Sequence, residues 1–246
     1  MIVGTADLKA LAARAPTLES FGSEPLELRH VEMLQIACEI AASEVEALYP
    51  PALHPTLPPL AVWQVYRCAE GALGGFTMAL LRLSCRSGVR PRGLVVAGFI
   101  DSAPAAQALA SRFGYPLRPA EVRLRRFYDE VTGAVVLDGD TILELAVRDA
   151  VPLSPSDVQY TAAMHLAQTP NGLRLLQVEP EHRLDRAERG TPRVVRFDAR
   201  AWGEVRIRPT LAVSASVVLG TVTIPPVRYV CRPDVLAFEG TERVGG

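Results

Sequence analysis

The feature that most constrains the fold of this chain is a long series of short apolar segments. The segments are rich in β-branched and aromatic residues, which favours strands over helices. Turn residues, such as the run TPNG at 169–172, separate many of them. This spacing predicts a mainly β (α+β) fold, built on a large antiparallel β-barrel or double sheet rather than on βαβ units. The predicted strands cover residues 61–68, 76–85, 93–100, 122–128, 134–137, 142–147, 158–166, 173–178, 194–197, 204–211, 217–224 and 227–231.

A few helices are expected at the periphery of this β assembly. Asp7 can cap a short amphipathic helix that ends near Arg14. Residues 43–49 combine a capping serine, acidic residues in the first turn and a Pro-Pro stop, which predicts a second helix. For a third helix, Ser102 supplies the cap, and Gly114 supplies the left-handed residue that ends it.

The chain is long enough to bury one large hydrophobic core. Of its 246 residues, 49% are hydrophobic. We therefore expect a single β domain over residues 31–235. An N-terminal arm (1–30), interrupted by prolines and glycine, precedes this domain, and a C-terminal tail (236–246) follows it. The run of acidic and basic residues at 179–190 is interpreted as a solvated loop.

The charge pattern and the cysteines argue against several classes of function. The formal net charge is −1 with acids and bases interspersed, so the chain lacks the dense basic face that binds nucleic acid. The four cysteines form no CxxC pair or Cys/His cluster, so no metal site is expected. No apolar run approaches the about 20 residues of a membrane span, and no signal-peptide pattern opens the sequence. We expect a soluble cytoplasmic protein.

The composition also restricts covalent chemistry. Lys9 is the only lysine, and arginine carries every other positive side-chain charge. An arginine side chain stays protonated, so only Lys9 or the N-terminal amine can form an imine. The sequence contains no dinucleotide-binding, phosphate-binding, zinc-protease or serine-hydrolase motif. We therefore expect no cofactor, and a small molecule as the substrate.

The order of elements between residues 78 and 118 resembles that of a known family. A strand, a second strand ending in aspartate, a helix and a Tyr-Pro turn follow one another, as in the acetoacetate decarboxylase-like superfamily. Later strands, the TPNG turn and an Ile-Pro pair at 224–225 also follow the family order. The resemblance covers about residues 32–233, and it implies the family's fold and a homo-oligomer. The matching residues are Asp101, Pro104, Ala105, Tyr115 and Pro116.

The departures from the family pattern fall on its catalytic residues. The family's Schiff-base lysine corresponds to Leu117, and the neighbouring lysine corresponds to Arg118. The family's pocket glutamate corresponds to Met78, and its pocket arginine to about Glu39. Leucine has no lone pair, so no imine can form at position 117. The resemblance therefore implies the fold but not Schiff-base decarboxylation.

Four residues are candidates for catalysis, each with a structural alternative. Arg118 is expected to bind a carboxylate or an enolate oxygen, the alternative being an arginine that faces solvent. Glu39 is a candidate general acid or base, or else an exposed glutamate. Tyr115 either hydrogen-bonds a substrate carbonyl or fills the core, and His165 is either a base or a buried structural histidine.

Further residues are candidates for lining the substrate pocket. Strand alternation places Arg82 on the same face as Met78, where it would be a second cation in the pocket or a member of a buried ion pair. The candidates that would shape the pocket or make it apolar are Met78, Leu80, Leu117, Trp63 and Gln64.

These features favour a cofactor-independent enzyme that acts on a small molecule. An apolar pocket with a few polar groups suits cyclisation, isomerisation or dehydration of a hydrophobic carbonyl compound. A polyketide-like biosynthetic intermediate is the expected substrate, by analogy with the family alone. Two alternatives stay open, namely a non-catalytic binding or carrier protein, and a lyase or decarboxylase that works without lysine.

Overall fold

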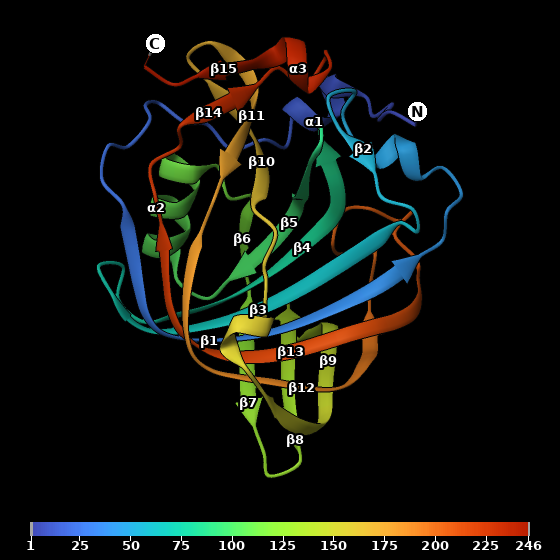
Figure 1. Ribbon diagram of the computed structural model, residues 1–246, viewed down its shortest axis with the longest axis vertical. Coiled ribbons are helices and arrows are strands. Elements are labelled where there is room, and N and C mark those ends of the chain that lie inside the picture. The colour runs from blue at the N-terminus through green and yellow to red at the C-terminus, as the bar shows by residue number, and fades with distance from the viewer. Residues whose placement is uncertain (1, 246) are drawn as a thin grey trace.

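One large mixed sheet dominates the computed structural model, which describes residues 2–245 (Figure 1). Two short strands lie at its side, because β2 (His54–Pro55) pairs with β4 and β6 (Leu117–Pro119) pairs with β5. The main path of paired neighbours is β15 (Thr241–Arg243), β14 (Tyr229–Cys231), β11 (Gly172–Val178), β10 (Ala163–Thr169), β5 (Arg90–Ile100), β4 (Phe76–Ser87), β3 (Leu60–Gly71), β1 (Leu26–Ile40), β13 (Pro209–Ile224), β12 (Glu181–Phe197), β9 (Asp140–Leu153), β8 (Glu130–Leu137) and β7 (Glu121–Arg126).

The expected mainly β class is confirmed, with two corrections to its form. β10 and β6 both run parallel to β5, so the sheet is not purely antiparallel. Within residues 2–245 the end strands β15 and β7 do not pair with one another, so the sheet does not close into a barrel. It bends over itself instead, and β7 lies against β3, β4 and β5. In Figure 1, β7, β8 and β9 accordingly run crosswise to β1 and β13.

The strands in the middle of the path separate two hydrophobic cores. Successive side chains of β4 point to opposite faces of the sheet. Leu81 and Leu83 therefore pack into a first core with Trp63, which residues of β7, β8 and β9 complete. Met78 and Leu80 pack into a second core, together with residues of α2 (Ala103–Phe113), β10 and β11. The candidate site lies in this second core.

The helices begin and end where their capping residues predict. At the start of α2 the Ser102 side chain accepts a hydrogen bond from the amide of Ala105 (3.4 Å), and Gly114 ends the helix with φ 69°. At the start of α1 (Leu8–Ala12) the Asp7 side chain accepts from the amide of Lys9 (2.9 Å). The predicted tail contributes α3 (Ala237–Gly240) and β15.

Four local predictions are wrong. The helix predicted at 43–49 is only a 3₁₀ turn, η1 (Val45–Leu48), because Glu44 just before it is left-handed (φ 57°). The strand predicted at 158–166 begins only at Ala163, after the 3₁₀ turn η2 (Pro155–Asp157). Of the strand predicted at 204–211, residues 204–208 lie outside any strand, and β13 begins at Pro209. The predicted loop at 179–190 belongs mainly to β12, where pairing with β9 and β13 uses its backbone.

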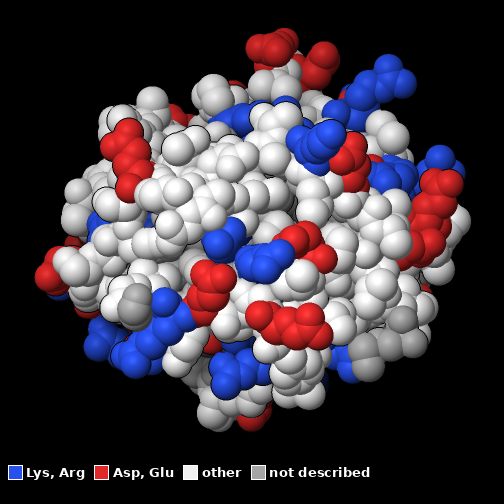
Figure 2. Space-filling model, turned by 90° about the horizontal axis from the view of Figure 1, so that it is seen from above, with Lys and Arg blue, Asp and Glu red and all other residues white. Residues whose placement is uncertain are grey.

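The surface carries both signs of charge close together. Figure 2 shows basic and acidic side chains interspersed on the face seen from above. Among residues 2–245, none of the helices combines the length and the apolar character that crossing a membrane requires. All four cysteines are buried and free.

Candidate functional site

A buried arginine lies at the centre of the candidate site. Arg82, on β4, is only 7% exposed. Its Nη1 donates to Oε1 of Gln64 (3.3 Å). Its Nη2 donates to the main-chain carbonyls of Thr161 (2.8 Å) and Ala162 (3.1 Å). Its Nε has no hydrogen-bond partner in the described part of the chain.

Within residues 2–245 Arg82 also has no acidic partner to balance its charge. The ionisable side chains that act on it are the phenols of Tyr66 and Tyr115 and the thiol of Cys85, and burial raises the pKa of all three. These groups are therefore neutral at physiological pH, and burial lowers the pKa of the Arg82 guanidinium. A buried cation without a counter-ion is unfavourable. The site is therefore suited to an anionic ligand.

The main chain of β5 leaves room for this guanidinium. A Cβ atom added at Gly93 would lie 2.4 Å from Nη2 and 2.6 Å from Nε of Arg82. Real Cβ contacts are not this short, so any larger residue at position 93 would displace the guanidinium from the carbonyls of residues 161–162. Gly93 is therefore a positioning residue for Arg82.

A neutral histidine lies in the same core. His165, on β10, is fully buried, and its Nδ1 donates to the carbonyl of Phe113 at the end of α2 (2.7 Å). Because Nδ1 holds the proton, Nε2 carries a free lone pair, and Nε2 has no partner within residues 2–245. Burial, reinforced by the charge of Arg82, lowers the pKa of His165 to about 3. The imidazole is therefore neutral at physiological pH.

Phenol and amide groups complete the polar cluster. The ring of Tyr115 packs edge-on against that of His165, with 4.2 Å between the ring centroids, and burial raises the pKa of Tyr115 to about 12. On β3 the hydroxyl of Tyr66 donates to Oε1 of Gln64 (2.9 Å), while Nε2 of Gln64 donates to Oε1 of Gln35 on β1 (2.6 Å). Gln64 is thereby held in the orientation that presents its oxygen to Arg82.

The segment before β10 closes one side of the second core. The ring of Tyr160 lies 4.6 Å from that of His182, and its hydroxyl is 3.4 Å from Oγ of Ser216. Burial, with a further contribution from the charge of Arg82, lowers the pKa of His182 to about 4. This segment includes Thr161, so Arg82 links it to the sheet through the hydrogen bond to the Thr161 carbonyl.

The structure brings most of the sequence-predicted residues together. Arg82 donates a hydrogen bond to Gln64, and Tyr115 packs on His165 in the same core. The apolar candidates lie beside them in that core. A Cβ atom added at Gly98 would lie 2.8 Å from a methyl group of Leu80 and of Leu117, so these two side chains flank the same point of β5. The apolar candidates in the second core are Met78, Leu80 and Leu117.

Three predicted residues lie outside this cluster. Trp63 points into the first core, opposite to Gln64. Arg118 points to the face opposite Leu117, where its Nη2 donates to the carbonyl of Ala201 (2.6 Å). Glu39 is half-buried and pairs with Leu60 at the far end of β1, four residues beyond Gln35 and so about 13 Å along the strand.

Sequence reasoning did not single out Tyr66, Thr161 or His182 for the site. Strand alternation contains a signal for Tyr66, since it lies two residues after Gln64 on the same face of β3. No local signal indicates Thr161 or His182, because their segments reach the site only through the tertiary fold. Within residues 2–245, no group of three or more His, Cys, Asp or Glu side chains is placed to hold a metal ion.

Comparison with known proteins gives a fold but no close relative. No protein-family model and no curated protein sequence matches the chain. Acetoacetate decarboxylase from Legionella pneumophila is similar in structure, at 17% identity and TM-score 0.73, over 85% of this chain and 88% of that one. The enduracididine biosynthesis enzyme MppR, complexed with pyruvate, matches at 16% identity and TM-score 0.67, over 83% and 89% of the two chains.

A third similar structure is an acetoacetate decarboxylase-like enzyme from Sphingomonas wittichii. It is 14% identical with TM-score 0.64, over 84% of this chain and 93% of that one. The chain therefore has the acetoacetate decarboxylase-like fold, as the resemblance over residues 32–233 predicted.

Proposed function

We propose that this chain is a small-molecule enzyme that binds a carbonyl compound through a carboxylate on Arg82. It would catalyse proton transfer leading to cyclisation, isomerisation or dehydration, without an imine. The observation that supports this best is the buried guanidinium of Arg82, which has no acidic partner and lies in one core with a neutral histidine. Leu117, at the family's lysine position, offers no amine to a carbonyl carbon.

The free donors of Arg82 suit a carboxylate. Within residues 2–245 Nε has no partner, and Nη1 uses one of its two hydrogens for Gln64. A carboxylate bound to Nε would accept a charge-assisted hydrogen bond and neutralise the buried charge. Met78, Leu80 and Leu117 would hold the apolar remainder of the substrate. The pyruvate complex of MppR, a protein with the same fold, is consistent with this class of ligand.

His165 and Tyr115 would carry the proton transfer. The charge of Arg82 is one cause of the low pKa of His165, so a bound carboxylate would raise that pKa. Nε2 would then remove a proton from the carbon next to the carbonyl group, while the Tyr115 phenol donates to the enolate oxygen. Return of the proton to another carbon gives an isomer. Attack of the enolate carbon on a second carbonyl carbon of the substrate gives a ring, and the oxygen of that carbonyl takes the proton from His165. Loss of a β-hydroxyl group that takes the same proton gives water and the dehydrated product.

A carrier protein is the second candidate, and one observation favours it. A histidine with a pKa of about 3 is a poor base at neutral pH unless the bound ligand changes it. In that case the cluster would bind a carboxylate and release it unaltered. The cluster would then explain binding but no turnover.

The test uses pyruvate and acetoacetate as a 2-oxo and a 3-oxo carboxylate. Calorimetry should show that both bind, and that Arg82→Met weakens binding by about tenfold or more. The matched control is Arg112→Met, because Arg112 also donates to a main-chain carbonyl (Glu24, 2.7 Å) and lies over an aromatic ring (Phe113, 5.1 Å) at the surface. Equal binding by the Arg82 variant would contradict the proposal.

Mass spectrometry separates the reaction classes when a longer oxo carboxylate with a hydroxyl group is added to the series, because pyruvate and acetoacetate can neither lose water nor close a ring. A changed retention time at constant mass supports an isomerase or cyclase, and loss of water supports a dehydratase. Loss of carbon dioxide would replace this reaction with lysine-independent decarboxylation. Recovery of every bound compound unaltered would favour the carrier. Borohydride added during incubation should leave no adduct on residues 112–118, because this segment contains no lysine.

A further inference from the structure

A groove lies at the edge of β5, on the far side of Tyr115 from the buried cluster. The outer edge of β5 pairs with β10 at Gly93–Val95 and with β6 at Gly98–Ile100. Val96 and Ala97 lie between these two pairings, and a groove of about 410 Å³ opens over them. This volume falls within the range of about 300–1,000 Å³ that is typical of small-molecule sites.

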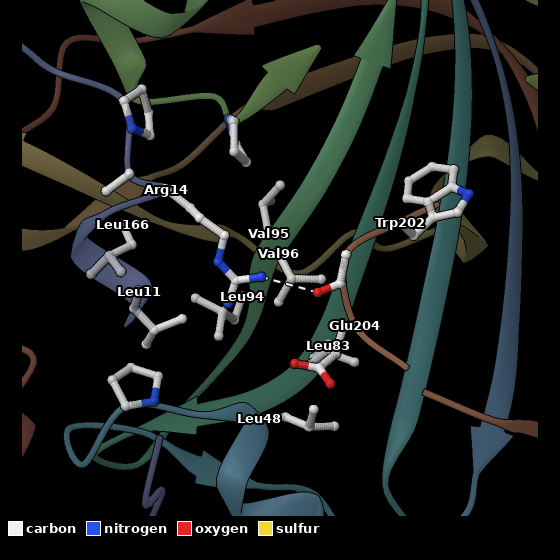
Figure 3. Close-up of a pocket in the computed structure, with 15 residues that line it drawn as sticks. Leu11, Arg14, Leu48, Leu83, Leu94, Val95, Val96, Leu166, Trp202 and Glu204 are labelled. Carbon is white, nitrogen blue, oxygen red and sulfur yellow. Dashed lines mark hydrogen bonds between the residues drawn. The ribbon is translucent and has the colours of Figure 1, made fainter. Parts of the chain in front are cut away.

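The walls of the groove come from three separate parts of the chain. The N-terminal arm supplies Arg14 and Pro16, the turn after β12 supplies Trp202, and the segment after α2 supplies Pro116 and Arg118. A smaller cavity of about 70 Å³ adjoins it, and Figure 3 shows Arg14 reaching across this cavity from the arm to the turn that carries Trp202. The arm is fixed there by main-chain hydrogen bonds to Gln168, which accepts from Leu18 (2.7 Å) and donates to Pro16 (2.8 Å).

Two arginines on opposite walls have no acidic partner. Nη1 of Arg14 donates to the carbonyl of Gly203 (3.0 Å), and Nη2 of Arg118 donates to the carbonyl of Ala201 (2.6 Å). Among residues 2–245 neither guanidinium forms an ion pair with a carboxylate. The charge of Arg14 helps to lower the pKa of Glu204, whose two oxygens already accept from Arg206.

These two guanidinium groups face one turn. Their acceptors are carbonyls only two residues apart, so both arginines reach the same turn beside the groove. Apart from Tyr115, the other side chains of the lining are apolar, and they include Trp202, which is 2% exposed. An oxyanion placed between two guanidinium groups gains charge-assisted hydrogen bonds from both.

We propose that this groove is a second binding site, for a small molecule that carries a carboxylate or phosphate on a flat apolar body. The oxyanion binds between Arg14 and Arg118, and the body lies on Val96, Pro116 and Trp202. The site uses different cations from the proposed chemistry at Arg82, although Tyr115 and Leu117 line the groove as well.

The test uses three probes with one ring system, namely 2-naphthoate, 2-naphthyl phosphate and the neutral 2-naphthamide. Binding is measured by calorimetry and by the change in tryptophan emission, since Trp202 lines the groove. At least one anionic probe should bind about tenfold or more tightly than the amide, and Arg118→Met should remove that advantage. The preferred anion identifies the head group. Arg14→Met should act in the same direction, and Arg112→Met should have no effect.

Each contrary result would overturn the proposal. Equal affinity for the amide and both anions would mean that the arginines do not recognise the charge. Unchanged binding by the folded Arg118 variant would place the probe elsewhere. Loss of probe binding in Arg82→Met, but not in Arg118→Met, would assign the probe to the buried cluster. Thermal unfolding of each variant checks that it is folded, and Arg118 is suited to this because its side chain is exposed.

Discussion

At the scale of single residues, the site depends on how closely β5 approaches Arg82. Gly93→Ala adds one methyl group 2.4 Å from Nη2, so the guanidinium must move away from the carbonyls of Thr161 and Ala162. We expect carboxylate affinity to fall about tenfold in calorimetry. Gly22→Ala is the control, because a Cβ atom there meets only the end of a flexible arginine at 3.6 Å. Unaltered affinity in Gly93→Ala would show that the position of Arg82 does not govern binding.

His165 makes stability depend on pH. Its pKa is about 3 in the folded protein and about 6.5 in an unfolded chain, so the unfolded state binds the proton more readily between these values. Stability is therefore lost as the pH falls through this window. We expect His165 to account for a loss of about 2 kcal/mol between about pH 7 and about pH 5 in urea unfolding. His165→Asn should remove this share of the dependence and leave the similar share of His182, whose pKa is lowered to about 4. An equally steep profile in the variant would assign the dependence to other groups.

The sequence predicts which of these residues lie near one another. It does not predict their hydrogen-bond partners equally well. Alternation along β4 places Arg82 with Met78, and the family resemblance places Tyr115 beside the pocket. The main-chain acceptors of Arg82, Thr161 and Ala162, lie 79 and 80 residues away in the chain. A contact of this range depends on the pairing of β10 with β5, which no local pattern encodes. For Arg118 the prediction of proximity fails. Adjacent residues of a strand point to opposite faces, so the side chain of Arg118 points away from that of Leu117.

At the scale of elements, α2 positions two members of the cluster. Its last residue, Phe113, accepts the hydrogen bond from His165, and Tyr115 lies two residues after Phe113. Gly114 between them has φ 69°, and a Cβ atom there would lie 3.1 Å from Ala167. We expect Gly114→Ala to lower the free energy of unfolding by about 1 kcal/mol or more in urea titration. A fully stable variant would mean that the left-handed turn is not required.

The elements differ in how well the sequence predicts them. α2 has a cap, alanines and a terminal glycine, so local signals agree and its limits are correct. The segment 158–166 looks uniformly β, but residues 158–162 instead cross the second core, where Arg82 holds the Thr161 carbonyl. β12 has a charged sequence typical of a loop, and only its pairing with two neighbouring strands makes it part of the sheet.

At the scale of the whole molecule, the two cores share the strands between them. Both tryptophans lie in the first core, whereas Leu80 lies in the second and is 2% exposed. Leu80→Ala should lower the unfolding free energy by about 2–5 kcal/mol. Because β4 contributes to both cores, Leu80→Ala should unfold in one transition that tryptophan emission and circular dichroism both report. The midpoint of that transition should lie at a lower denaturant concentration than in the unsubstituted protein.

A matched control for this prediction is Leu211→Ala, since Leu211 is 58% exposed and should change stability by less than about 0.5 kcal/mol. If tryptophan emission kept its original midpoint in Leu80→Ala while circular dichroism shifted, the two cores would unfold separately.

The position of Lys9 gives the molecule a single point of attack for a lysine-specific protease. Lys9 is exposed, but it lies within α1, and a protease binds its substrate as an extended strand. Cleavage after Lys9 therefore requires α1 to unwind, and its rate measures how often this part of the arm opens. A molecule bound in the adjoining groove would slow this one cut. The rate of cleavage at Lys9 therefore reports how often the arm opens, without any added label.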